Sequence, residues 1–117
     1  MATIEKGKAF VANEAITYAE GGIVSKEFIH NQGGSVTLFS FDKGQRLSEH
    51  SAPFDAVLQI IDGELEIIVD GKPTVVKAGE MFIIPANAPH AVNAIKPFKM
   101  IITMIKDNFD QKVAMKK

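Results

Sequence analysis

The sequence contains no cysteine and no tryptophan, and it has only one tyrosine, Tyr18, and one arginine, Arg46. Without cysteine the chain forms no disulfide, offers no thiolate to a metal ion and has no cysteine nucleophile. This absence fits a cytoplasmic protein, which is the location that we predict.

Long apolar runs are also missing. The opening stretch "MATIEKGKAF" brings Glu5, Lys6 and Lys8 before any hydrophobic segment develops, so we expect no signal peptide there. No apolar stretch approaches the roughly 20 residues that a membrane-spanning helix requires. The sequence therefore predicts no contact with a membrane.

An excess of positive charge is lacking as well. Thirteen Lys+Arg stand against fourteen Asp+Glu, which gives a formal net charge of -1. A protein that binds nucleic acid needs a basic surface to neutralise phosphates, so we expect no nucleic-acid partner. The one small basic cluster, Lys112, Lys116 and Lys117, lies at the C-terminus and is typical of a solvated chain end.

A chain of 117 residues is long enough for one hydrophobic core. We predict a single domain over residues 1–117, with a core barrel over about 23–105, an N-terminal arm over 1–22 and a C-terminal tail over 106–117. The segment "VANEAITYAEGG" (11–22) is the one candidate for a helix, and Gly21-Gly22 keeps it short.

From residue 23 onward, β-forming residues alternate with turn signals. The stretch "GSVTLFSFD" (34–42) is rich in β-branched and aromatic residues, and "MFIIP", "HAVNAI" and "FKMIITMI" are further short strands. Between residues 56 and 80, Asp62-Gly63 and Asp70-Gly71 are signals for tight turns and predict three strands in hairpin succession. About eight strands at this spacing predict an all-β sandwich, jelly roll or small barrel.

Two sets of spaced residues narrow this choice. Gly79 is followed by five residues, Pro85, Asn87 and His90, and a closing asparagine, Asn93, stands one position early. This resembles the second motif of the cupin superfamily, Gly-x5-Pro-x-Gly-x2-His-x3-Asn. Asn87 replaces a glycine there, and asparagine tolerates the left-handed backbone better than most residues.

The first cupin motif runs Gly-x5-His-x-His-x3–4-Glu-x6-Gly, and Gly44, His50 and Gly63 match it in register. Alanine stands at its second histidine and at its glutamate, at positions 52 and 56. Together the two motifs cover about residues 34 to 105. The resemblance implies a double-stranded β-helix (jelly-roll) barrel with His50 and His90 facing inward, and it implies a homodimer in which the N-terminal segment takes part.

Cupins that bind metal typically hold Fe, Mn, Ni, Zn or Cu with three His and one Glu. Ala52 and Ala56 have no lone pair to donate, and two imidazoles alone hold a divalent ion weakly. We therefore expect either a weakly held divalent metal at His50 and His90 or no metal. Strand parity turns Gln59 and Glu49 away from the interior, and His30 lies outside both motifs.

The predicted ligand pocket combines the motif positions with a candidate anchor and soft apolar residues. Arg46 is the candidate anchor for a carboxylate, and methionine suits an adaptable apolar wall. The predicted pocket residues are His50, Ala52, Ala56, His90, Arg46, Met81 and Met100, with Met104 on the same strand as Met100.

Three functions are compatible with this pattern. We predict a barrel that binds a small molecule, with no specific reaction assigned. The alternative is a metal-dependent enzyme acting on a small molecule: an oxygenase, isomerase, decarboxylase or lyase. The third is metal-free acid–base catalysis, as in sugar-epimerase relatives of the fold, with a histidine as base and Tyr18 as the acid to test.

Overall fold

The structure is a computed structural model, and it describes residues 4–106. Within that range the protein is almost entirely β, as the sequence predicted, and its eight strands pair antiparallel. No helix in this range is long and apolar enough to cross a membrane. The predicted C-terminal tail and its lysine cluster fall, apart from Lys106, outside the described residues. The strands are β1 (Ile23–Asn31), β2 (Gly34–Phe41), β3 (Arg46–His50), β4 (Ala56–Val69), β5 (Lys72–Lys77), β6 (Met81–Ile84), β7 (His90–Asn93) and β8 (Phe98–Ile105).

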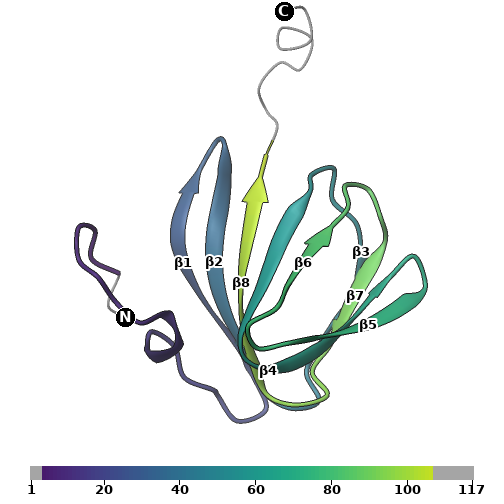
Figure 1. The fold of residues 1–117 in the computed structure, drawn as a ribbon, viewed down its shortest axis with the longest axis horizontal. Helices are drawn as coiled ribbons and strands as arrows, with labels where there is room; N and C mark the ends of the chain where they lie inside the picture. Colours follow the sequence, from purple (N-terminus) through teal and green to yellow (C-terminus); the bar gives the residue numbers. More distant parts are fainter. Residues whose placement is uncertain (1–3, 107–117) are drawn as a thin grey trace, which may run out of the picture.

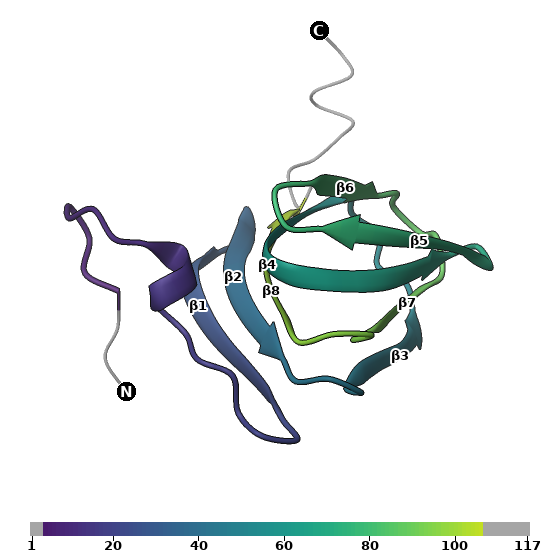
Figure 2. The same ribbon diagram turned by 60° about the horizontal axis from the view of Figure 1, so that its bottom comes forward.

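Strand β4 joins two sheets into one barrel (Figures 1 and 2). Its first half pairs with β8 on one side and β6 on the other, which gives a sheet in the order β1-β2-β8-β4-β6. Its second half pairs with β5 and β7, and β7 continues to β3. We call these the first and the second sheet. Because one strand passes from one to the other, their inner faces are held against each other.

The bend in β4 occurs at Asp62-Gly63, where the sequence predicted a hairpin turn. That prediction is wrong: the strand continues, and its pairing with β8 shifts between Ile60 and Asp62. Gly63 has φ +70°, and a Cβ atom there would overlap the carbonyl oxygen of Pro97. Glycine is thus required because the strand bulges here and two backbones approach closely. An Asp-Gly pair in the sequence is equally compatible with such a bulge and with a hairpin turn.

The second turn signal is confirmed. Asp70 and Gly71 connect β4 to β5, with Val69 paired to Lys72. Their φ angles of 50° and 80° are both positive, as a type I′ hairpin turn requires.

One end of the barrel is filled by large side chains from neighbouring strands. The rings of Phe41 and Phe98 stack with their centroids 4.6 Å apart, and both are fully buried together with Met100. Ile60 of β4 belongs to the same cluster. This packed end fixes where β2, β4 and β8 lie relative to one another, since interiors at this density tolerate little displacement. In Figure 1 it is the lower end, toward which the strands converge.

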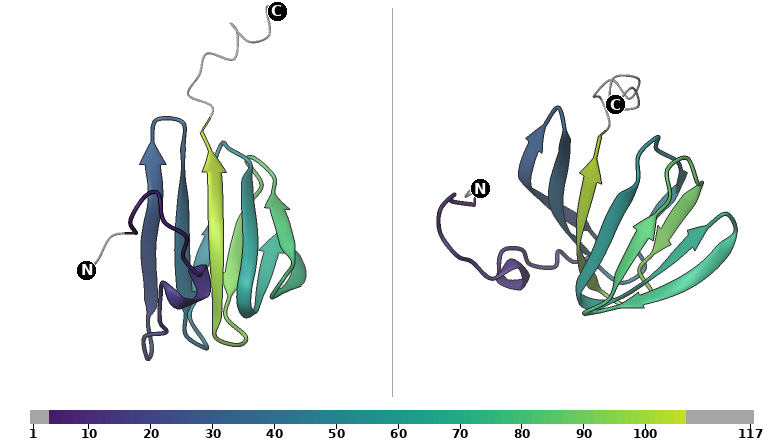
Figure 3. Two further views of the ribbon diagram at one scale, coloured as in Figure 1. Left: turned by 60° about the vertical axis from the view of Figure 1, so that its left-hand side comes forward. Right: turned by 45° about the horizontal axis from the view of Figure 1, so that its top comes forward.

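The N-terminal arm lies across the outer face of the first sheet (Figure 3, left). Its only helical turn in the described range is the 3-10 turn Ala12–Glu14, so the short helical or irregular segment expected there is confirmed. Three side chains of the sheet donate hydrogen bonds to arm carbonyls: Ser40 to Thr17 at 3.0 Å, Lys26 to Ala15 at 2.8 Å and Lys99 to Asn13 at 2.7 Å. The arm therefore covers polar groups of the outer face and leaves the barrel interior open.

Candidate functional site

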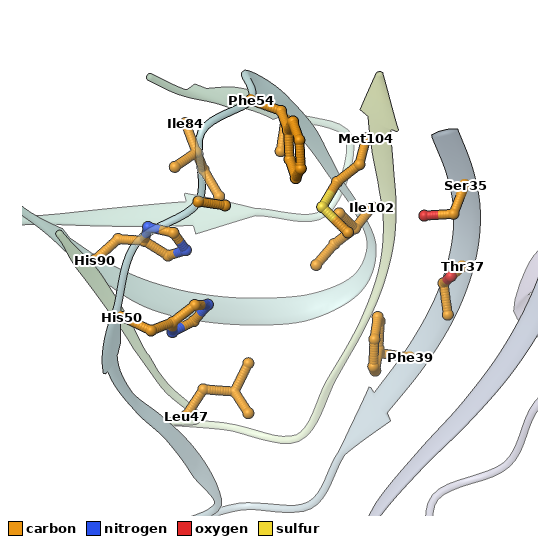
Figure 4. Close-up of a pocket in the computed structure, with 12 residues that line it drawn as sticks. Ser35, Thr37, Phe39, Leu47, His50, Phe54, Ile84, His90, Ile102 and Met104 are labelled. Atoms are coloured by element: carbon orange, nitrogen blue, oxygen red, sulfur yellow. The ribbon is translucent and has the colours of Figure 1, made fainter. Parts of the chain in front are cut away.

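A cavity of about 210 Å³ lies inside the barrel at the end opposite the stacked Phe41 and Phe98 rings. Both sheets contribute to its wall, and the loop between β3 and β4 closes one side (Figure 4). Most of the lining is apolar, and four side chains carry polar atoms. The lining residues are Ser35, Thr37, Phe39, Leu47, His50, Ala52, Phe54, Ala56, Ile84, His90, Ile102 and Met104.

His50 and His90 face the cavity as a cross-strand pair. They stand opposite each other on β3 and β7, with ring centroids 4.3 Å apart. The pairing of β3 with β7 shifts between Leu47 and His50, so β3 contains an extra residue there. The bulge breaks the two-residue alternation, and as a result both Leu47 and His50 line the cavity.

The hydrogen bonds of the two rings define their tautomers. Nδ1 of His50 lies 2.9 Å from the carbonyl oxygen of Ser48, and Nδ1 of His90 lies 3.1 Å from that of Ala88. A carbonyl oxygen only accepts, so each Nδ1 carries the proton and donates it. In the neutral ring, Nε2 then keeps a free lone pair. Neither Nε2 has a hydrogen-bond partner within residues 4–106.

Two hydrogen bonds hold the rim of the cavity. The amide of Asn87 donates to the carbonyl oxygen of Ala52 at 2.7 Å, and the amide of Ala86 donates to the Asp55 carboxylate at 2.8 Å. These bonds tie the β3–β4 loop, which carries Phe54, to the loop before β7. Asn87 has φ 68°, the left-handed conformation expected from its place in the motif.

Of the seven residues predicted for the pocket, the structure brings His50, Ala52, Ala56 and His90 together around the cavity. Arg46, Met81 and Met100 are not among the lining residues. Arg46 is an exposed residue at the start of β3, before the bulge. Met81 is 61% exposed, because β6 turns Ile84 inward and Met81 lies on the opposite face. Met100 points inward but is fully buried one layer deeper, in the packed end.

The other polar residues weighed in the sequence lie outside the cavity. Gln59 and Glu49 are exposed on their strands, and His30 lies on β1 with Nδ1 3.8 Å from the Glu27 carboxylate. Tyr18, on the arm, donates a hydrogen bond to Asp62. Burial and that carboxylate raise the pKa of the Tyr18 hydroxyl far above its ordinary value. Tyr18 is therefore not placed to act as the acid of a site at His50 and His90.

Met104, named from the sequence beside Met100 as a candidate for the apolar wall, lines the cavity, whereas several other lining residues on β2 and β8 were not anticipated. The alternation in "GSVTLFSF" puts Ser35, Thr37 and Phe39 on one face, and the same period puts Ile102 and Met104 together on β8. Alternation was a usable signal there. It did not say which face was the inner one, because both faces of β2 and β8 carry apolar residues.

Comparison with known proteins establishes the family. The family model described as Cupin domain matches residues 37–105. The protein belongs to the cupin family. This cupin has the family's barrel and two of its motif histidines, and alanine at the two remaining ligand positions.

Two solved structures show how closely the fold is shared. A conserved protein of unknown function from Streptococcus pyogenes, SPY1581, is 31% identical, with a TM-score of 0.84 over 91% of this cupin and 96% of that chain. A Cupin 2 conserved barrel domain protein from Leptotrichia buccalis is 45% identical over 80% of this cupin, with a TM-score of 0.78. The match spans 46% of the Leptotrichia chain, so this cupin covers less than half of that protein.

Curated relatives carry the name pyrimidine/purine nucleoside phosphorylase. The one from Geobacter sulfurreducens is 29% identical over 87 residues, which are 73% of this cupin and 82% of the relative. The one from Geotalea uraniireducens is 30% identical over 80 residues, 67% of this cupin and 75% of the relative.

Proposed function

We propose that this cupin binds a small, mainly apolar molecule in the cavity and orients it with His50 and His90. The observation that carries the proposal is the wall itself: eight apolar side chains enclose the space, and two imidazoles meet at one side. Small-molecule sites are commonly built in this way, with apolar walls and a few convergent polar groups. Neither a specific ligand nor a reaction follows from the fold alone.

The two histidines do not form a complete metal site. Within residues 4–106, no three His, Cys, Asp or Glu side chains come together as a metal-binding group. Ala52 and Ala56 line the cavity where the family motif has its other two ligands. Two imidazoles leave a divalent ion dependent on water or ligand atoms for its remaining positions, so we expect weak binding.

Elemental analysis of untagged protein, beside a His50→Ala/His90→Ala double variant, tests this expectation. Little metal in either sample, with both folded, supports a barrel that binds its ligand without metal. About one equivalent of a transition metal in the native protein and little in the variant would contradict it. That result would favour the metal-dependent enzyme instead, with His50 and His90 as ligands.

Phosphorolysis of nucleosides is the second candidate, because the curated relatives at 29–30% identity bear that name. The reaction needs inorganic phosphate bound beside the sugar, and phosphate sites usually present Arg, Lys or backbone N–H groups. No Arg or Lys is among the residues that line the cavity. We therefore place this activity second. The assay is release of free base from a purine and a pyrimidine nucleoside with phosphate, with the double variant as control.

The homodimer and the cytoplasmic location stay predictions. Light scattering on the purified protein measures the mass of the assembly, and a monomer would contradict the first of them.

A further inference from the structure

We infer, building on the proposed function, that the cavity selects a neutral molecule with a hydroxyl or N–H donor on one apolar ring, and that it discriminates against anions. The tautomers of the two rings, together with the charge and size of the rest of the wall, decide which chemical group can face the histidine pair.

The histidine pair presents acceptors, not donors. Both Nδ1–H groups are used on backbone carbonyls, at 2.9 Å for His50 and 3.1 Å for His90. What remains toward the cavity is the lone pair of each Nε2. A ligand hydroxyl or N–H pairs with such a lone pair, whereas a carboxylate or phosphate oxygen would face it with a second lone pair. His90 is 9% exposed, whereas His50 is exposed to solvent.

The rest of the wall contains no positively charged side chain. The twelve lining residues include no Arg and no Lys. Arg46, the candidate anchor for a carboxylate, is exposed outside the cavity. An anion entering this space would lose its hydration without gaining a counter-charge, which is a large penalty in an apolar environment.

The wall opposite the histidines suits an apolar ring. Figure 4 shows Phe39, Ile102 and Met104 across the cavity from the two imidazoles, with Ser35 and Thr37 beyond them on β2. An engineered apolar cavity of roughly 150 Å³ binds benzene, so a cavity of about 210 Å³ has room for one ring with a small substituent. The hydroxyls of Ser35 and Thr37 offer a second polar contact at the far side.

The test uses three monosubstituted benzenes, toluene, phenol and benzoate, titrated at pH 8.0 in the presence of EDTA. We expect phenol to bind about 3- to 10-fold more tightly than toluene, the contribution of one net hydrogen bond, and benzoate to show no saturable binding. A cavity without an acceptor gives the reverse order for phenol and toluene, since the phenol hydroxyl then loses its bonds to water.

The outcomes separate this inference from the proposed function. Toluene binding as tightly as phenol overturns the inference and leaves an apolar binding site. Benzoate binding as tightly as phenol also overturns it, because the site then accepts an anion. If none of the three probes binds, the proposed function itself fails and the inference with it.

Variants and spectroscopy locate the effect. In His50→Leu and His90→Leu we expect the ratio of phenol to toluene affinity to fall toward one, while Arg46→Ala, outside the cavity, leaves it unchanged. His50→Gln restores an acceptor and part of the ratio. The ¹⁵N chemical shifts of the histidine rings in the native protein should show a protonated Nδ1 and an unprotonated Nε2 for both residues. The opposite tautomer in either ring overturns the inference. This measurement does not depend on whether a Leu variant folds.

Discussion

The two ends of the barrel are built from the same strands and differ in what those strands place inside. On β2, Phe41 fills one end, and Ser35 and Thr37 border the other. On β8, Phe98 packs into the filled end, and Met104 lines the cavity at the open end. The strands converge at the first end and spread at the second (Figures 1 and 3). The comparison shows that a cavity in this fold needs no special architecture, only smaller side chains and an unfilled layer at one end.

Strand β4 by itself shows the same change from a filled interior to an open one. Ile60 and Leu58 are fully buried in the packed layers, and Ala56, two residues further along the same face, lines the cavity. Ala56 stands where the first cupin motif has a glutamate, and Ala52 stands where that motif has its second histidine. The two small side chains of Ala52 and Ala56 thus leave this part of the cavity open.

The largest expected effect comes from truncating the packed end. Phe98→Ala removes a fully buried ring that stacks on Phe41, and we expect a loss of about 3–5 kcal/mol in the free energy of unfolding. The matched change at the open end, Phe39→Ala, should cost clearly less, since Phe39 is only partly buried and already borders the cavity. Chemical denaturation measures both. Equal losses would mean that the two ends are packed alike.

Next in size is the bend of β4. Gly63→Ala adds a Cβ that overlaps the Pro97 carbonyl and also places alanine at φ +70°, so we expect a loss on the order of 2–4 kcal/mol. Gly71→Ala is the control, because it has φ +80° but open space around its Cβ. Its free energy of unfolding should fall only by the penalty for placing alanine in the left-handed backbone conformation, about 1–2 kcal/mol. A Gly71 variant as unstable as the Gly63 variant would contradict the close approach.

Filling the open end should affect binding far more than stability. Ala56→Leu puts a larger apolar side chain into the cavity, and because it fills open space we expect a smaller loss in the free energy of unfolding than for Gly63→Ala. Binding of phenol and toluene should be lost. Denaturation and titration of the same sample check both halves. Retained binding of phenol would place the ligand outside this cavity.

The smallest effect concerns a surface carboxylate next to the packed end. Asp42 accepts hydrogen bonds from the amides of Gly21 at 2.6 Å and Lys43 at 2.9 Å, and these bonds lower its pKa below the ordinary 3.8. The ionised form therefore stabilises the fold above about pH 4, and this contribution disappears as the pH falls through the folded-state pKa.

Asp42→Asn should accordingly be slightly less stable than the native protein at pH 6, and the difference should vanish near pH 2. Denaturation at the two pH values is the measurement. A difference that persists unchanged at pH 2 would mean that the charge of Asp42 is not its source.

Local sequence was sufficient to predict several features of this protein. Alternation and turn residues predicted the strands, Asp70-Gly71 predicted a hairpin turn, and the motif spacing predicted an inward-facing His50 and His90 and the left-handed Asn87. Each of these depends on residues close in the chain, or on a spacing that the family maintains.

The tertiary structure alone decided which side of a strand is the inside. In the wholly apolar β6 no polar residue marks the outer face, and the prediction that Met81 lines the pocket put it on the wrong face. On β3 the bulge between Leu47 and His50 shifts the alternation, and in β4 a glycine that signals a turn instead forms a bend. Whether an inward residue meets space or core, as for Met104 and Met100, depends on side chains from other strands, and the order of residues along one strand contains no such information.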